Sequence, residues 1–163
     1  MNHFSKIFFM QTETITLKVI STVFSHKGHI PSEYTCDGKN INPPLEVSNI
    51  PEGTKTLALI MEDPDAPRGT FDHWLVWNIS PNEAIAEQSD IGISGTNDFG
   101  KTGYGGPCPP SGVHRYFFKV YALDTKLGLL AGADKRALLD AMTGHILAEG
   151  SIMGLYKKRN ASL

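Results

Sequence analysis

Four stretches of the chain have the hydrophobic pattern of β-strands. Residues 14–20 alternate apolar and polar side chains, which predicts a strand buried on one face. Residues 56–62 and 74–79 are apolar at most positions, as strands covered on both faces are. Residues 115–124 combine aromatic and β-branched side chains and form the clearest strand of the chain.

The pattern changes to a helical period after Gly132. Asp134 is a residue type that caps helices, and Gly150 is a residue type that ends them. Between them, an apolar stripe at helical spacing predicts one helix, made of Leu138, Ala141, Met142 and Ile146. Residues 152–157 then predict a last short strand.

Strands come first and a single helix comes late, so the chain lacks the strand–helix alternation of a parallel doubly wound sheet. Sixteen glycines and ten prolines are spread along the sequence, which favours a turn-rich β protein. Residues 25–51 form a long irregular stretch of the kind that usually serves a site, with short strand pieces near Tyr34 and 45–47. We predict one mainly β domain over 1–163, with 1–13 as a loosely ordered extension.

Composition and charge exclude several function classes. The net charge of −2 gives no basic surface for nucleic acid. Apolar runs reach only four or five residues, which predicts no membrane-spanning helix. The apolar patch within the first ten residues is too short for a signal sequence, so we expect a cytoplasmic protein. Cys36 and Cys108 match no zinc spacing, and we favour two reduced thiols over a disulfide.

Residues 95–102 match the phosphate-binding pattern GxxxxGK[ST] without its structural context. That motif needs a strand before it and a helix after it. The segment before it is a poor strand, and the glycines and prolines of 103–110 exclude a following helix. We therefore expect no nucleotide site there. Asp63 and Asp65 do not begin a calcium loop, because Pro67 stands where the next oxygen ligand is required.

The most informative residues fall in two stiff loops, each followed by a strand. The first loop carries Asp63, Asp65 and Pro67, and it leads to His73 and Trp74. An ordinary polar hairpin turn is the alternative explanation for this loop.

The second loop, 105–113, contains Pro109 and Pro110 and leads to His114 and Tyr116. If the two following strands lie side by side, His73 and His114 face one small cavity with Trp74 and Tyr116 as its aromatic walls. Each histidine could instead be a core residue with satisfied hydrogen bonds.

These motifs resemble the phosphatidylethanolamine-binding protein family, also called Raf kinase inhibitor-like proteins, in its short bacterial and archaeal branch. The resemblance extends from about residue 17 to residue 156, and these segments carry it: 42–45, 63–67, 73–74, 98–104, 106–116 and the helix containing 144–148. It implies two antiparallel β-sheets with Greek-key topology, a few peripheral helices and a small anion pocket. The pocket residues that it implies are Asp63, Asp65, Pro67, His73, Pro109, Pro110, His114 and Tyr116.

The chemistry of these residues favours an anion site without a metal or a cofactor. A carboxylate repels an anion, so we expect Asp63 to accept a hydrogen bond from an imidazole and fix its tautomer. A carboxylate meeting the ammonium of an ethanolamine-like head group is the alternative. We expect the stiff Asp63-Pro64-Asp65 segment to direct the two carboxylates to opposite sides of the chain, which disfavours a metal site. Arg115 should point away from His114 and pair with a buried carboxylate.

Two functions follow as hypotheses. The first is a non-catalytic protein that binds phosphate or a phosphorylated head group and acts by binding or inhibiting a protein partner of unknown identity. The second is an enzyme acting on an anionic metabolite, with His73 as general base and Asp63 orienting it. Regulation of a kinase and assembly as a homodimer are implied by the resemblance alone.

Overall fold

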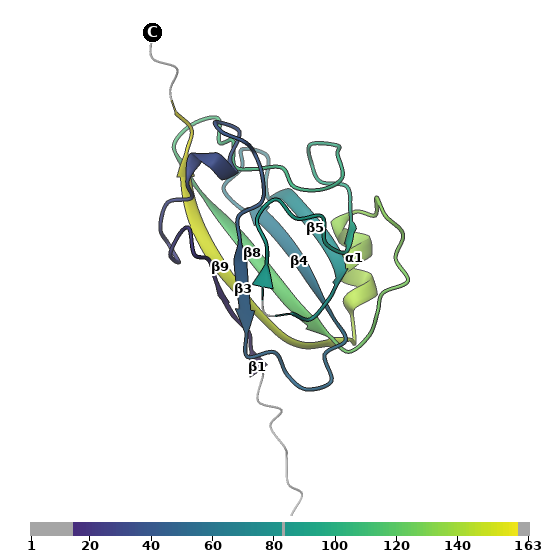
Figure 1. Cartoon of the computed structure of the whole chain (residues 1–163). Helices are drawn as coiled ribbons and strands as arrows, with labels where there is room; N and C mark the ends of the chain where they lie inside the picture. The colour runs from purple at the N-terminus through teal and green to yellow at the C-terminus, as the bar shows by residue number, and fades with distance from the viewer. Residues whose placement is uncertain (1–14, 83, 160–163) are drawn as a thin grey trace, which may run out of the picture.

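The computed structural model describes residues 15–82 and 84–159, which form two β-sheets and one α-helix (Figure 1). The larger sheet has the strand order β1-β9-β8-β4-β5-β7, and the smaller has the order β2-β3-β6. The strands are β1 (Ile15–Thr16), β2 (Lys18–Ile20), β3 (Leu45–Ser48), β4 (Thr56–Asp63), β5 (Phe71–Ile79), β6 (Ala84–Ile85), β7 (Ile93–Ser94), β8 (Val113–Leu123) and β9 (Ile146–Lys157). The predicted mainly β fold with two sheets is confirmed. All strand pairs are antiparallel except β1 with β9.

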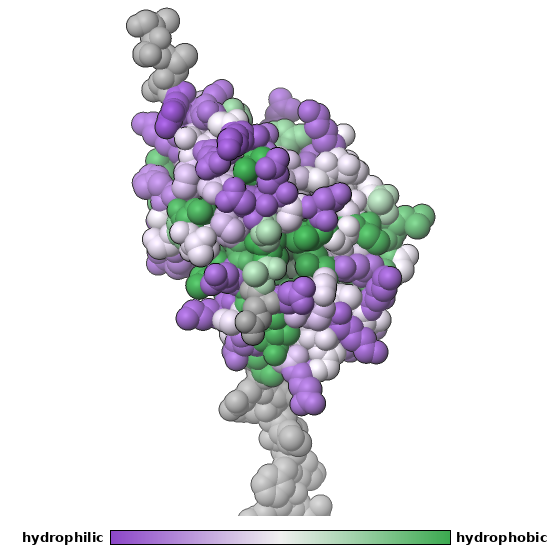
Figure 2. All heavy atoms as spheres, viewed as in Figure 1, coloured by the Kyte–Doolittle hydropathy of each residue, from purple (hydrophilic) through white to green (hydrophobic). Residues whose placement is uncertain are grey.

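The main core lies between the two sheets. Alternate side chains of β4 and β8 point inward and pack against the inner side chains of the small sheet and against Leu17, which precedes β2. The core contains Leu57, Leu59, Met61, Tyr116, Phe118 and Val120 of the large sheet and Val19, Leu45 and Val47 of the small one. Each fully buried large apolar side chain contributes roughly 1.5–3 kcal/mol. The small sheet buries only one face, and its outward residues Lys18, Glu46 and Ser48 are exposed. Figure 2 shows this side of the molecule, with hydrophilic residues over its upper end.

A second core explains why β4 is apolar at nearly every position. Its outward side chains Ala58 and Ile60 pack with Leu75 and Trp77 of β5 beneath α1 (Lys135–Met142). The helix contributes Leu138 and Met142. The predicted cap is confirmed, because the Asp134 side chain accepts a hydrogen bond from the Ala137 N–H at 2.9 Å.

The predicted end of the helix is wrong. We expected Ile146 in the helical stripe and Gly150 at its end, but both lie in β9. Gly144 has φ +83°, a conformation that breaks a helix and suits glycine. From Ile146 onward the chain pairs with β8 over its whole length, and these long-range hydrogen bonds outweigh local helix preference.

The predicted strand over 14–20 divides between the two sheets. Ile15 and Thr16 pair with β9, whereas Lys18 to Ile20 pair with β3. Because the strand changes sheets, Ile15 is 42% exposed and does not share the buried face of Leu17. Thr14 and the predicted extension over 1–13 lie outside the described residues.

The expectation of two free thiols is wrong, because Cys36 and Cys108 form a disulfide. The bond joins the segment after the short 3-10 helix η1 (Ser32–Tyr34) to the loop that precedes β8. The Cys36 N–H also donates to the Pro107 carbonyl at 3.1 Å. A separation of 72 residues carries no pairing signal in the sequence, since the two loops meet only in the folded chain.

Among the described residues, no helix has the length and apolar character needed to cross a membrane.

Candidate functional site

A small cavity of about 160 Å³ lies where the end of β4 meets the starts of β5 and β8. Seven of the eight predicted site residues line it, and so do four residues that sequence reasoning missed. The predicted ones are Asp63, Pro67, His73, Pro109, Pro110, His114 and Tyr116, and the missed ones are Ala66, Phe71, Phe99 and Cys108. The Phe71–Phe99 ring pair is the nearest apolar surface to His73.

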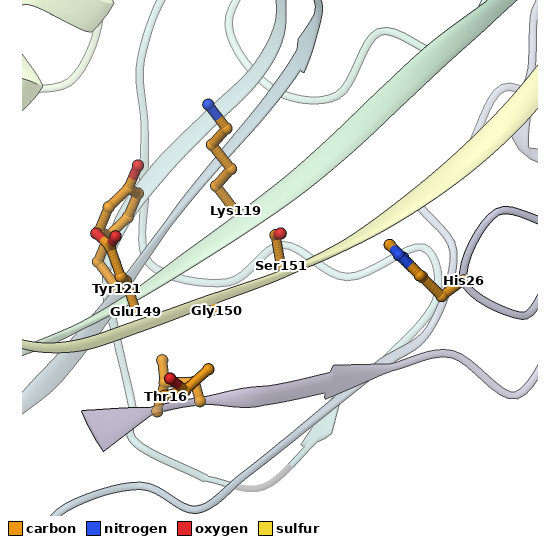
Figure 3. Close-up of a pocket in the computed structure, with 8 residues that line it drawn as sticks. Thr16, His26, Lys119, Tyr121, Glu149, Gly150 and Ser151 are labelled. Atoms are coloured by element: carbon orange, nitrogen blue, oxygen red, sulfur yellow. The ribbon is translucent and has the colours of Figure 1, made fainter. Parts of the chain in front are cut away.

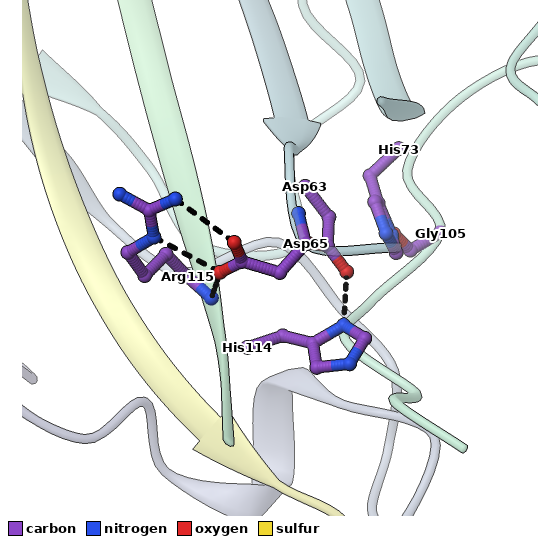
Figure 4. Close-up of polar contacts among 6 residues, drawn as sticks. All are labelled: Asp63, Asp65, His73, Gly105, His114 and Arg115. Atoms are coloured by element: carbon purple, nitrogen blue, oxygen red, sulfur yellow. Dashed lines mark hydrogen bonds and ion pairs between the residues drawn. The ribbon is translucent and has the colours of Figure 1, made fainter. Parts of the chain in front are cut away.

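The strand order explains how the two histidines come together. The strands that carry His73 and His114 are not adjacent, because β4 lies between β5 and β8. Asp63 is the last residue of that middle strand and therefore stands between the two imidazoles (Figure 4). The cavity is thus built around a central carboxylate with a histidine from each side.

A β-bulge aims His73 into the cavity. Met61 pairs with Trp74, but the next residue, Glu62, pairs with Asp72, so His73 is the extra residue of β5. In a regular strand His73 would share the outer face with Leu75. The bulge shifts the alternation by one, so that His73 lines the cavity and Asp72 turns outward.

Both carboxylate oxygens of Asp63 are already occupied by the protein. Oδ2 accepts a hydrogen bond from Nδ1 of His114 at 2.6 Å, and Oδ1 accepts one from the Asp65 N–H at 2.7 Å. Asp63 and His114 are 3% and 7% exposed. The expected carboxylate–imidazole pair is present, and the imidazole is that of His114. The alternative in which Asp63 orients His73 does not fit this geometry.

His73 is oriented by the backbone. Its Nδ1 lies 2.7 Å from the Gly105 carbonyl oxygen. A carbonyl can only accept, so Nδ1 carries the hydrogen and Nε2 is the nitrogen left for a ligand. Burial lowers the pKa of His73, while the Gly105 carbonyl and the charge of Asp63 act in the opposite direction. His73 is therefore held neutral at neutral pH.

Tyr116 brings a hydroxyl that lies near the Asp63 carboxylate and the Cys108 backbone but has the geometry of a hydrogen bond with none of the described residues. The side chain is fully buried, and its ring packs edge-on against His73 with the centroids 5.3 Å apart. Burial raises the pKa of Tyr116, and the charge of Asp63 raises it further, so the hydroxyl keeps its hydrogen. A buried hydroxyl without a partner costs stability, which a ligand in the cavity would recover.

Asp65 is the one predicted site residue that does not line the cavity. It turns to the outer face, where its Oδ2 and Oδ1 accept hydrogen bonds from Nε and Nη2 of Arg115 at 2.9 Å and 2.8 Å (Figure 4). The hydrogen bond from the Arg115 side chain holds the pKa of Asp65 at about 2. The expected splay of the two carboxylates and the pairing of Arg115 are confirmed, although Asp65 is half-buried rather than buried.

Trp74 is not a wall of the cavity, contrary to expectation. It follows His73 on β5 and points into the core, where its ring packs edge-on against that of Tyr104.

The phosphate-loop pattern over 95–102 is followed by no helix, since the described chain from 103 to 112 contains turns and irregular structure. Within 15–82 and 84–159, no group of three or more His, Cys, Asp or Glu side chains is arranged to hold a metal ion.

A larger hollow of about 550 Å³ lies on the outer face of β8 and β9 (Figure 3). Its side chains do not converge as those of the small cavity do. Lys119 and Thr16 lie on opposite sides of the β9 ribbon in Figure 3, and Lys119 is already paired with Glu62. The small cavity is therefore the better candidate site, although it is the smaller of the two.

Known proteins resemble the chain along nearly its whole length. The family model for phosphatidylethanolamine-binding protein matches residues 20–157. The UPF0098 protein PH1269 of Pyrococcus horikoshii is 48% identical over 158 residues, which cover 90% of this chain and 79% of that protein. A UPF0098 protein of Methanothermobacter thermautotrophicus is 50% identical over 143 residues, covering 83% of this chain and 95% of its own length.

Solved structures show the same relationship. The crystal structure of a phosphatidylethanolamine-binding protein homologue, CT736 of Chlamydia trachomatis, superposes with a TM-score of 0.86 at 42% identity, and the match covers 90% of this chain and 100% of that chain. YbcL of E. coli, described as a member of the mammalian PEBP family, superposes with a TM-score of 0.81 at 30% identity, covering 88% and 99%. The chain belongs to the phosphatidylethanolamine-binding protein family.

Proposed function

We propose that this protein binds a small phosphate-bearing anion in the cavity around Asp63, and that it acts by binding rather than by catalysis. The ligand and a protein partner together would define its role. Family membership supports a binding function, since members of the family are mostly non-enzymatic binding proteins.

One observation carries the proposal: among the described residues, the buried Tyr116 hydroxyl has no hydrogen-bond partner. At the same cavity, His73 and His114 use Nδ1 for their hydrogen bonds to the protein, so Nε2 of each ring is available to a ligand. Their other polar neighbours are already paired, because the two Asp63 oxygens and both Nδ1 atoms make hydrogen bonds within the protein. Buried polar groups in proteins are generally paired, so this set is suited to a ligand with several oxygens.

The size of the cavity limits the ligand to a small group. Its volume of about 160 Å³ is below the roughly 300 Å³ at which pockets for drug-sized ligands begin. Pro67, Pro109 and Pro110 line it, and their fixed φ angles reduce the ordering entropy that binding would cost. A phosphate or a phosphorylated head group fits this description, whereas acyl chains do not.

The experiment is a calorimetric titration with inorganic phosphate and with O-phosphoethanolamine, at pH values of about 6 and about 8 on either side of a histidine's usual titration. The proposal predicts saturable binding that weakens at the higher pH, because a phosphate monoester loses its second hydrogen near a pH of about 6 and then brings a second negative charge close to Asp63. His73→Ala should abolish binding. Absence of binding to the wild-type protein at both pH values would refute the proposal.

The Asp63–His114 pair supports one alternative, an enzyme with His114 as general base. Their 2.6 Å hydrogen bond has the geometry by which a carboxylate orients a basic imidazole. This differs from the sequence-based version, in which His73 was the base. Turnover of a phosphate ester that His114→Asn abolishes, with ligand binding retained, would favour the enzyme over the binding protein.

A further inference from the structure

The unpaired nitrogen of His73 is an acceptor, and this property restricts the ligand. Its Nδ1 hydrogen is committed to the Gly105 carbonyl at 2.7 Å, so in the neutral ring Nε2 presents a lone pair. A bare anionic oxygen facing that lone pair would be repelled. We infer that His73 selects a ligand oxygen that carries a hydrogen, so that the pocket prefers inorganic phosphate and phosphomonoesters over sulfate and phosphodiesters.

The surroundings of His73 keep the ring neutral. The rings of Phe71 and Phe99 lie 4.9 Å and 5.3 Å from it, and Tyr116 lies against it from β8. Asp63 on β4 is the nearest charge, but both of its oxygens are occupied by His114 and the Asp65 N–H. Asp98, in the loop after β7, is the other charged group that acts on the ring, and one of its oxygens accepts the Asp72 N–H.

The charges around the cavity support the same selection. Among residues 15–82 and 84–159, those that line it include one carboxylate, Asp63, and neither lysine nor arginine. Two arginines adjoin lining residues in the sequence: Arg115, after His114, is directed to the outer face and paired with Asp65, and Arg68, after Pro67, does not line the cavity. A doubly charged anion would therefore find little compensation, whereas a singly charged anion with a P–OH group could donate to Nε2 of His73.

The inference rests on the proposed function and makes it more specific. A phosphomonoester keeps one P–OH below its second pKa of about 6. Inorganic phosphate keeps a P–OH at neutral pH, whereas sulfate and a phosphodiester have none to donate. The shared chemistry is thus a tetrahedral oxyanion with a hydroxyl, supplied either by free phosphate or by a monoester head group, and the diester of an intact phospholipid is disfavoured.

The test compares matched ligands by calorimetry at a pH of about 5.5, where the monoester is largely protonated. One pair is phosphate and sulfate, and the other is O-phosphoethanolamine and its glycerol diester, glycerophosphoethanolamine. In the wild-type protein, the P–OH ligand of each pair should bind at least about tenfold more tightly. Binding of phosphate without the monoester would assign the site to the free ion, and binding of both would admit the head group.

A matched variant tests whether Nε2 of His73 is the atom that makes the pocket prefer phosphate over sulfate. In His73→Asn, the amide nitrogen takes the place of Nδ1 and can still donate to the Gly105 carbonyl, but the acceptor at Nε2 is gone. The preference for phosphate over sulfate should then fall to about twofold or less. His145→Asn, at a histidine paired with Asp124 away from the cavity, should leave the preference unchanged.

The outcomes separate the two proposals. Equal affinity of the wild-type protein for phosphate and sulfate overturns the inference and leaves the proposed function in place. Unchanged selectivity in a folded His73→Asn variant also overturns it, because another group would then be the selector. Absence of binding by all four ligands refutes both proposals. The wild-type selectivity ratio decides the inference even if the variant does not fold.

Discussion

Each face of the large sheet carries a polar cluster where β4 ends and β5 begins. The two clusters differ in how many of their polar groups have hydrogen-bond or ion-pair partners. On the outer face, Nζ of Lys135 donates to Glu62 at 2.7 Å and to Asp72 at 2.9 Å, and Lys119 also binds Glu62. On the inner face, the Tyr116 hydroxyl has no hydrogen-bond partner among the described residues, and the histidines on either side of Asp63 use only Nδ1 for hydrogen bonds to them.

The difference shows how to tell a structural cluster from a binding site. Burial raises the pKa of Glu62, but the hydrogen bonds from Lys119 and Lys135 outweigh it and lower the pKa overall. At Asp72, burial outweighs the hydrogen bond from Lys135 and raises the pKa, but each carboxylate has a lysine partner, and Lys135 fastens α1 to the sheet. Neighbouring residues along a strand supply both clusters, because Glu62 precedes Asp63 and Asp72 precedes His73. Incomplete pairing, rather than charge or burial, therefore marks the inner cluster as the site.

The largest expected effect comes from removing the disulfide whose Cys108 lines the small cavity. Replacing both cysteines in a Cys36→Ala, Cys108→Ala variant should reduce the free energy of unfolding by about 2–4 kcal/mol, because the unfolded chain is no longer cross-linked. Chemical denaturation measures the loss. A reducing agent should produce the same loss in the wild-type protein and none in the variant. If reduction leaves the wild-type midpoint unchanged, the disulfide does not stabilise the fold.

The next effect concerns the outer cluster. Lys135→Met removes the cation between Glu62 and Asp72 and should cost about 2 kcal/mol of stability at neutral pH. The loss should shrink as the pH falls below about 4, where protonated carboxylates no longer need the cation. Phosphate affinity should stay the same, since Lys135 does not line the cavity. Lys126→Met, at an exposed lysine after β8, is the matched control.

The third effect is smaller and tests whether Asp63 helps phosphate binding by orienting His114 or hinders it by repelling the anion. Asp63→Asn removes the charge that holds the Nδ1–H of His114 and should weaken phosphate binding about tenfold. Calorimetry with phosphate measures it. If the carboxylate only repelled the anion, the same change would tighten binding, and that result would contradict the role assigned to Asp63.

The smallest effect is expected at the outer carboxylate Asp65. Asp65→Asn should reduce stability by about 0.5–1 kcal/mol at neutral pH and leave anion affinity unchanged. The pKa of Asp65 is lowered from 3.8 to about 2 in the folded protein. Its contribution is therefore complete above the unfolded-state pKa and is lost as the pH falls through about 2. Denaturation curves of the wild type and variant should converge in that range.

Local rules predicted much of this site, and long-range pairing explains the rest. Alternation along a strand placed Arg115 opposite His114, as the structure confirms. Asp63 and Asp65 would share a face in a regular strand, and they separate because β4 ends at Asp63 and the chain then turns. The same rule alone would have put His73 on the wrong face, because a bulge has no clear sequence signal. The end of the helix and the disulfide were missed since both depend on segments that meet only after folding.

The most direct test of the account observes the imidazole nitrogens themselves. Nitrogen NMR of the histidine side chains, recorded with and without phosphate, reports which nitrogen of each ring carries a hydrogen. The account predicts a neutral His73 protonated at Nδ1, and a phosphate-dependent shift at Nε2 of His73 and His114 but not in the ring of His145. A hydrogen on Nε2 of His73 in the free protein, or rings that do not respond to phosphate, would contradict it.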